Sequence, residues 1–476
     1  MTIIAPSKTL ADRPHGARAS ARLEPWLAEA GALMRLSLPL IATQLAHMAM
    51  PTTDIFMIGT LGQDALAVAA LATTIYIFAL LIGLGPASAI APIIAHIVGA
   101  NPSDRARARI ALRMGLWAMV VLTAPLCFSL MFAEYALLAL GQTAKMAAAA
   151  APYVQILAIG LPFALGFNVL RNFSTALGNA RAPLIIMSAA VILNIILDYG
   201  LIFGRLGMAE FGLTGAAIAT AICDAFCFFA LAALLTFAPA FRSYRIWRRF
   251  HRADWRRFGE TFRLGASIGV TMIFETALFA GSTLAMGFFG TAALAAHHIA
   301  MNVPSISFMV PLGIAMAASV RVGYAAGAGD PEGARRAGLT ALMMGGGFMC
   351  LCALLLALLP RAIIGLYLDL RDPANEYAIA YAVSFLYVVA ALQIFDGIQV
   401  VAAFSLRGLK DVRMPILIAG VSYWGAGLPL ALLLGFVIGW EGVGIWIGLA
   451  AALMIAAALL SARFFYLSAP KIRSTQ

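Results

Sequence analysis

Charged residues are scarce in this chain, and their scarcity sets the class of protein. Lys, Arg, Asp and Glu make up 11% of the 476 residues, whereas hydrophobic residues make up 63%. Soluble domains carry about 25% charged residues, because a folded globule needs a polar surface. The composition excludes a soluble enzyme and a disordered scaffold, and the formal net charge of +11 does not indicate a nucleic-acid partner. The sequence is that of an integral membrane protein.

Three further absences narrow the function. The chain has no GxxxxGK[ST] phosphate-binding loop, and neither end has room for an ATPase domain, so we expect secondary transport without an ATPase subunit. The five cysteines fall inside apolar runs without CxxC spacing, which favours neither a disulfide nor a metal centre. Residues 1–32 lack the apolar segment of a cleavable signal peptide. We therefore expect no cofactor other than a coupling ion.

Long apolar runs, by contrast, are abundant. A helix needs about 20 mostly apolar residues to cross a hydrocarbon core of ~30 Å. Twelve runs reach this length, which predicts an all-α integral membrane protein with twelve transmembrane helices. The predicted spans are 36–60, 66–98, 110–133, 150–178, 183–204 and 211–238 in the first half, and 264–288, 292–320, 338–360, 376–406, 414–437 and 443–465 in the second.

The cationic residues indicate the orientation of these spans. If the N-terminus is cytoplasmic, 28 of the 32 Lys and Arg residues fall on the cytoplasmic side, and eight of them lie between residues 242 and 263. Cytoplasmic loops of membrane proteins carry such an excess. We predict that both termini are cytoplasmic and that the arginine-rich segment lies on anionic membrane lipid.

The two halves of the chain resemble each other at an offset of about 228–232 residues. Residues 62–67 match residues 290–295, and residues 177–183 match residues 409–415. Six spans in each half bring both halves into the membrane from the same side, which predicts a parallel repeat about the membrane normal. The predicted organisation is a cytoplasmic N-terminal segment 1–32, an N-lobe 33–238, a basic cytoplasmic linker 239–262, a C-lobe 263–466 and a cytoplasmic tail 467–476.

Acidic residues inside the predicted spans are the leading functional candidates. A carboxylate in the bilayer costs several kcal/mol, so its presence favours a function. No Lys or Arg lies deep in a span by this interpretation, and we expect these carboxylates to meet protons, metal cations or a cationic substrate. They are Asp54, Asp198, Asp224, Glu275 and Asp396.

Four polar residues of the first half lie at a similar depth. At ~1.5 Å per residue, Asp54 and Asp198 both fall in the outer half of the membrane. Asn194 shares a helix face with Asp198, and Thr220 reaches the same level. We predict that these four side chains form an N-lobe cation pocket. Oxygen ligands suit Na⁺, while two neighbouring carboxylates can share a proton, so both ions stay open.

The second half carries its own candidates. Glu275 lies near the middle of its span, and Asp396 lies well inside another, next to Gln393. This pair predicts a second cation or substrate site, and Na⁺ is a candidate ion for it. Gln44, Asp224, Gln393 and His297 complete the candidates; packing with a hydrogen bond remains the alternative role of His297.

Several segments resemble one family of transporters. They are 54–59 in the first half, and 274–279, 295–302, 320–323, 396–400, 406–411 and 422–424 in the second half. Together they resemble the multidrug and toxic compound extrusion (MATE) family, especially its bacterial NorM-type branch, over roughly residues 33–465. A carboxylate at Asp198 is similar to the DinF-type branch instead.

The resemblance implies a monomeric antiporter of two six-helix lobes in the bacterial inner membrane. By alternating access it would expel cationic amphipathic drugs and toxins in exchange for Na⁺ or H⁺, and it would not be an enzyme. By residue match, Glu275 and Asp396 would bind cation and substrate in the C-lobe. Asp54, Asn194, Asp198 and Thr220 would form the N-lobe cation pocket.

Two other functions stay open. A flippase of lipid-linked saccharides has a related architecture, but it would need a strongly cationic central cavity, which the shortage of Lys and Arg in the spans disfavours. A membrane-embedded glycosyltransferase would need a large outer domain or paired carboxylates at the membrane interface. The predicted outer loops are too short for such a domain.

Overall fold

The computed structural model describes residues 15–469, apart from the side chains of residues 15–23 and Ala374, and every regular element in this part is helical. Of the predicted terminal segments, residues 1–14 and 470–476 lie outside the described residues, and residues 15–32 form the start of the first helix. The first half contains α1 (His15–Gly59), α2 (Gln63–Ser88), α3 (Ile90–Ala100), α4 (Arg105–Met131), α5 (Ala133–Ala139), α6 (Ala144–Ala176), α7 (Arg181–Phe203), α8 (Leu213–Phe237) and α9 (Pro239–Arg242). The second half contains α10 (Trp255–Gly287), α11 (Thr291–Gly327), α12 (Pro331–Leu358), α13 (Pro360–Ile364), the 3₁₀ turn η1 (Pro373–Asn375), α14 (Glu376–Gly408), α15 (Arg413–Ala419), the π-helix η2 (Gly420–Gly427), α16 (Leu428–Leu432), the π-helix η3 (Leu433–Val437) and α17 (Glu441–Ser468).

The predicted spans agree with these helices. Between residues 15 and 469, eleven helical segments are long and apolar enough to cross a membrane, and they match the last eleven predicted spans. The first predicted span, 36–60, lies within α1, which is less apolar because it carries Gln44, His47 and Asp54. The protein is thus an all-helical integral membrane protein with eleven or twelve spanning helices.

Two predicted spans are less regular than the sequence pattern suggested. The span 66–98 is divided into α2 and α3 at Ala89, three residues before Pro92. Proline has no N–H and clashes with the preceding turn, so the helix is interrupted there. The span 414–437 alternates between α and π turns, in a stretch that contains four glycines and Pro429. Apolar content predicts that a segment spans, but it does not predict such local changes of helix type.

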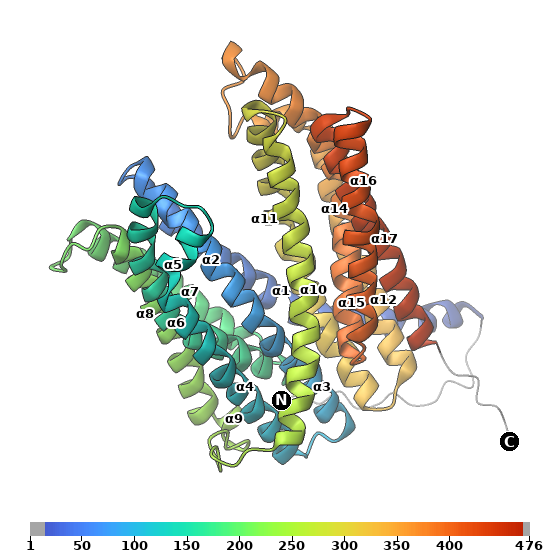
Figure 1. The fold of residues 1–476 in the computed structure, drawn as a ribbon. Coiled ribbons are helices and arrows are strands. Elements are labelled where there is room, and N and C mark those ends of the chain that lie inside the picture. Colours follow the sequence, from blue (N-terminus) through green and yellow to red (C-terminus); the bar gives the residue numbers. More distant parts are fainter. Residues whose placement is uncertain (1–14, 470–476) are drawn as a thin grey trace.

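The two halves of the chain form two groups of helices. Figure 1 shows the first half, blue to green, on one side and the second half, yellow to red, on the other. The groups meet where α2 packs against α10 and where α1 and α3 pack against α11. The contact is close: a Cβ atom added to Gly85 would lie 2.3 Å from the carbonyl oxygen of Gly265. Glycine is required there because the two backbones touch.

Both halves also meet through a partly buried ion pair near the end of the molecule that carries most arginines. Arg321 of α11 donates two hydrogen bonds to the Glu29 carboxylate of α1, with an Nε–Oε1 distance of 2.8 Å. This bidentate geometry is the strongest form of an Arg–carboxylate pair. The pair and the glycine contacts hold the halves together at one end.

The predicted linker 239–262 is attached to α4 rather than free. Arg113 donates to the carbonyl of Arg249 at 2.6 Å, and the Trp117 indole donates to the carbonyl of Phe250 at 3.0 Å. The Trp117 and Phe250 rings also stack, with centroids 6.0 Å apart. The last part of the predicted linker is already helical, because α10 begins at Trp255. The linker is therefore a packed part of the first half.

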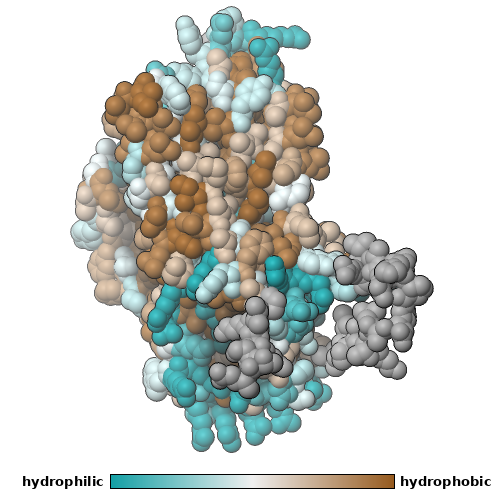
Figure 2. Space-filling view, turned by 90° about the vertical axis from the view of Figure 1, so that its right-hand side faces the viewer, coloured by the Kyte–Doolittle hydropathy of each residue, from teal (hydrophilic) through white to brown (hydrophobic). Residues whose placement is uncertain are grey.

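The outer surface fits a lipid environment. Figure 2 shows hydrophobic residues over much of the flank of the molecule, whereas hydrophilic residues gather at its ends, most densely at the lower one. Large apolar side chains such as Leu284 and Phe288 are 75% and 81% exposed. In water such a surface would drive association, so contact with lipid tails accounts for it.

Candidate functional site

A cavity of about 680 Å³ lies mainly among the helices of the first half. Its walls come from α1, α2, α6 and α8, and α10, α11 and α14 contribute side chains where the halves meet. Most of the lining is apolar, with a few polar groups from each helix. This volume falls within the range of ~300–1,000 Å³ that binds drug-sized molecules in proteins.

The four predicted residues of the N-lobe pocket come together beside this cavity. Asn194 of α7 donates to Asp54 Oδ1 at 3.1 Å, and the Thr220 hydroxyl of α8 donates to Asp54 Oδ2 at 3.0 Å. Asp198 lies one turn after Asn194, with its carboxylate within hydrogen-bonding reach of Asp54. The depth argument placed these residues at one level, and the packing of α1 against α7 and α8 brings them into contact.

Asp54 and Thr220 connect this cluster to the cavity. Both line the cavity, whereas Asp198 and Asn194 are fully buried behind them. Both carboxylate oxygens of Asp198 and the amide oxygen of Asn194 have no donor among the described residues. Buried oxygens without donors are costly, and a proton or a small cation between Asp54 and Asp198 would satisfy them. The cluster can therefore hold either ion.

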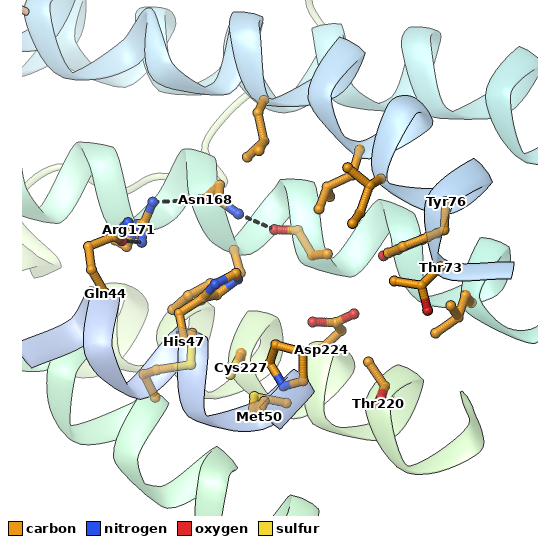
Figure 3. A pocket seen from close by; sticks show the side chains of 18 of the residues that line it. Gln44, His47, Met50, Thr73, Tyr76, Asn168, Arg171, Thr220, Asp224 and Cys227 are labelled. Atoms are coloured by element: carbon orange, nitrogen blue, oxygen red, sulfur yellow. Dashed lines mark hydrogen bonds between the residues drawn. The ribbon is translucent and has the colours of Figure 1, made fainter. Parts of the chain in front are cut away.

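Asp224 is a second carboxylate in the cavity wall. It lies one turn after Thr220 on α8, and Figure 3 shows it directed toward Tyr76 of α2. No ion pair within 4 Å is found for it in residues 15–469. A cavity-facing carboxylate beside an aromatic ring suits an organic cation, because both groups attract positive charge.

Two arginines near helix ends line the cavity, although the sequence predicted no Lys or Arg deep in a span. Arg171 of α6 and Arg407 of α14 are 8% and 7% exposed, and both line the cavity. Each lies in the last turns of a long helix, where counting residues from the sequence placed it at the membrane surface. Burial between helices brings them inside the bundle. The shortage of Lys and Arg in the spans is therefore a weaker argument against a flippase of lipid-linked saccharides, because two arginines do line the cavity.

Arg171 belongs to a polar cluster with two other candidates for ligand contact. Its Nη1 donates to Gln44 Oε1 at 2.8 Å, and its Nη2 donates to Asn168 Oδ1 at 2.7 Å. Gln44, a predicted candidate, therefore lies in the cavity wall, together with His47. Sequence reasoning missed the role of Arg171. The signal for it was a lone arginine inside an otherwise apolar run near Asn168.

The predicted C-lobe pair does not line this cavity. Glu275 of α10 and Asp396 of α14 lie close enough for their charges to interact, and the charge of Arg407 also acts on Glu275. Asp396 is 8% exposed, and its Oδ1 has no donor among the described residues. The Tyr423 hydroxyl, which accepts a hydrogen bond from Gln399 at 2.7 Å, also lies near this pair. The second half thus holds a separate polar cluster.

Two further candidates lie outside the cavity wall. The His297 ring is fully buried, with Nε2 3.0 Å from the Thr283 hydroxyl and its plane against Trp446. Gln393 is also fully buried and accepts a hydrogen bond from Ser307 at 3.3 Å. Neither residue reaches the cavity. Their contacts are those of packed, hydrogen-bonded side chains.

Comparison with known proteins gives matches over nearly the whole chain. A family model described as MatE matches residues 39–200 and residues 267–433, once in each half. The probable multidrug resistance protein NorM of Mesorhizobium japonicum is 43% identical over 450 residues, which cover 94% of this chain and 96% of that protein. The protein of the same name from Brucella suis is 41% identical over 439 residues, covering 92% and 93%. Among solved structures, a mutant of the Vibrio cholerae MATE transporter VcmN has a TM-score of 0.84 at 19% identity, covering 93% of this chain and 98% of that one, and shows the shared fold.

A helical bundle with a lipid-facing surface, a drug-sized cavity and, among the described residues, buried carboxylate oxygens without donors is typical of a membrane transporter. The matches with known proteins identify the family of membrane transporters to which the chain belongs. The chain belongs to the MatE family, the multidrug and toxic compound extrusion transporters, and to its bacterial NorM-type branch.

Proposed function

We propose that this protein exports cationic amphipathic compounds in exchange for Na⁺ or H⁺. The observation that carries the proposal is a largely apolar, drug-sized cavity whose wall contains two carboxylates, Asp54 and Asp224. The apolar lining favours the body of an amphipathic compound, and the carboxylates favour its positive group. The names of its relatives, probable multidrug resistance proteins, point to the same substrates.

Asp54 connects substrate binding with ion binding. It faces the cavity on one side and hydrogen bonds with Asn194 and Thr220 on the other. A proton or Na⁺ held between Asp54 and Asp198 reduces the negative charge that the cavity presents. An organic cation and the coupling ion therefore oppose each other's binding, which is the thermodynamic requirement of antiport.

The cluster of Glu275 and Asp396 is the proposed second cation site. It lies in the other half and has its own nearby cation, Arg407. Because this cluster does not face the cavity, we assign it to the coupling ion rather than to direct drug contact. Its charge state then affects how the second half packs when the lobes move.

Alternating access follows from the way the halves meet. We take the moving units to be the N-lobe 33–238 and the C-lobe 263–466, related as a parallel repeat, with the cavity exposed to one side at a time. The segment 239–262 and both termini are assigned to the cytoplasm, the membrane is the bacterial inner membrane, and the transporter acts as a monomer. Glycine contacts such as Gly85 against Gly265 then close the cytoplasmic side.

Transport into proteoliposomes tests this proposal. Ethidium movement is recorded under a Na⁺ gradient at equal pH, and separately under a pH gradient in Na⁺-free buffer. We expect one of the two gradients to drive transport and Asp54→Asn to abolish it. Asp64→Asn, an exposed carboxylate at the start of α2, is the matched control and keeps wild-type rates. If neither gradient moves ethidium, the antiport proposal is wrong.

A flippase for lipid-linked saccharides is the second candidate, and the buried arginines of the cavity favour it. Arg171 and Arg407 could face a diphosphate group. The same vesicles test it with a fluorescent lipid-linked saccharide. Flipping of this lipid without ethidium transport would favour the second candidate.

A further inference from the structure

Arg171 is a buried cation without an acidic partner. It is 8% exposed, and the described residues supply no carboxylate that offsets its charge. The other buried arginines differ in this respect. Arg113, which is 6% exposed, has the Asp254 carboxylate nearby, and Arg407 has the Glu275 carboxylate nearby. Arginine keeps its charge in proteins, so the charge of Arg171 cannot be removed by losing a proton.

Neutral side chains hold the Arg171 guanidinium in place. Gln44 and Asn168 each accept one hydrogen bond from it through an amide oxygen. The Asn168 amide nitrogen donates to the carbonyl of Ala164 at 2.9 Å, which fixes the oxygen of Asn168 toward Arg171. A guanidinium has five N–H donors, so one remains on each terminal nitrogen after these two bonds. The Nε atom has no partner among the described residues.

This arrangement is costly unless a ligand completes it. A buried charge without a counter-charge destabilises a protein, and amide oxygens compensate only part of the loss. Arg171 lines the same cavity as Asp224, and Figure 3 shows the two side chains at separate places along it, with His47 between them. The cavity thus presents a positive group and a negative group to one occupant.

We propose that Arg171 forms an anion subsite that binds the carboxylate of a transported compound. A zwitterionic amphipathic compound would then place its cationic group at Asp224 and its carboxylate at Arg171. A guanidinium with two free N–H donors on its terminal nitrogens matches the two oxygens of a carboxylate. The inference rests on the proposed export function, since it names a substrate class for the same cavity.

Two dyes that differ by one methyl group test the subsite. Tetramethylrhodamine carries a free carboxylate at neutral pH, and its methyl ester carries only the positive charge. Binding of each dye to the purified full-length protein in nanodiscs is measured by fluorescence anisotropy. We expect Arg171→Gln to weaken binding of the carboxylate dye, relative to the ester, by about tenfold or more.

Controls separate this subsite from the cavity itself. Asp224→Asn removes a charge that faces the positive group of both dyes, so it weakens both and leaves their ratio unchanged. Arg171→Lys keeps the charge but loses the forked donors, and we expect an intermediate ratio. Should Arg171→Gln not fold, the ratio for Arg171→Lys carries the test.

The outcomes distinguish two failures. If both dyes bind and the ratio stays at the wild-type value in the folded Arg171 variants, the anion subsite is wrong while the proposed function stands. If neither dye binds to the wild-type protein, the proposed export of amphipathic cations is wrong as well.

Discussion

The contact between Gly265 and α2 predicts that a single methyl group will open one side of the transporter. In Gly265→Ala, the new Cβ atom would lie 2.1 Å from the Cα atom of Pro86. Nonbonded carbon atoms need about 3.5–4.0 Å, so the two backbones must part by about 1.5 Å. Overpacking of this kind costs roughly 1–3 kcal/mol. The overpacking destabilises only the arrangement in which the two halves are closed on each other. The equilibrium constant between the closed and open arrangements therefore shifts toward the open one by roughly 5- to 150-fold.

Maleimide labelling measures this shift. Ser319 of α11 lines the cavity and is 3% exposed, so we expect Ser319→Cys to be protected while the halves are closed. The probe is added to the cytoplasmic face of inside-out vesicles, in a background whose five native cysteines are replaced by alanine. We expect Gly265→Ala to raise the labelling rate about tenfold or more.

A second glycine on the same helix provides the control. A Cβ atom added to Gly281 of α10 would have no heavy atom within 4 Å. Adding Gly281→Ala to the Ser319→Cys protein should therefore leave the rate of maleimide labelling at position 319 unchanged, that is, at the rate of the Ser319→Cys protein alone. Equal rates for Gly265→Ala and Gly281→Ala, in proteins that insert normally, would refute the assignment of this contact as the closed side.

Three further predictions follow from the site and from the ion pair between the halves. Glu275→Gln or Asp396→Asn should abolish ethidium efflux from whole cells while membrane insertion, followed by immunoblot, stays normal; wild-type efflux by either variant would contradict the C-lobe assignment. Asp224→Asn should weaken ethidium binding roughly tenfold in a fluorescence titration, because it removes a charge from the cavity wall without changing its shape. Glu29→Gln should raise the labelling rate at the cytoplasmic face several-fold by weakening the pair with Arg321. The exchanged variant Glu29→Arg with Arg321→Glu should restore slow labelling, and failure of the single variant to change the rate would remove this pair from the closing contact.

The sequence predicted what depends on distance along a helix. The number of spans followed from apolar length, and the meeting of Asp54 with Asn194, Asp198 and Thr220 followed from their depth in the membrane. These arguments work because an α-helix rises by a fixed ~1.5 Å per residue and must cross a layer of known thickness.

The sequence did not predict toward which neighbouring helices a side chain is directed. Depth alone did not show that Arg171 and Arg407 turn inward, or that Glu275 and Asp396 face away from the main cavity. The packing of neighbouring helices decides which face of a helix lines the cavity. The hydrophobic periodicity of one sequence does not show how those helices pack. The candidate roles of these residues remain predictions for the experiments above.

The attachment of the linker to α4 has a mechanical consequence. Arg257 near the start of α10 donates to the carbonyl of Arg107 at 3.4 Å, so the arginine-rich end of α10 is attached to the first half although α10 is the first helix of the second half. A helix of 33 residues is about 50 Å long. Pivoting by about 10° at its fastened end would carry its far end about 9 Å. On this geometry α10 pivots at its arginine-rich end, and the widest movement falls at the opposite end of the helix.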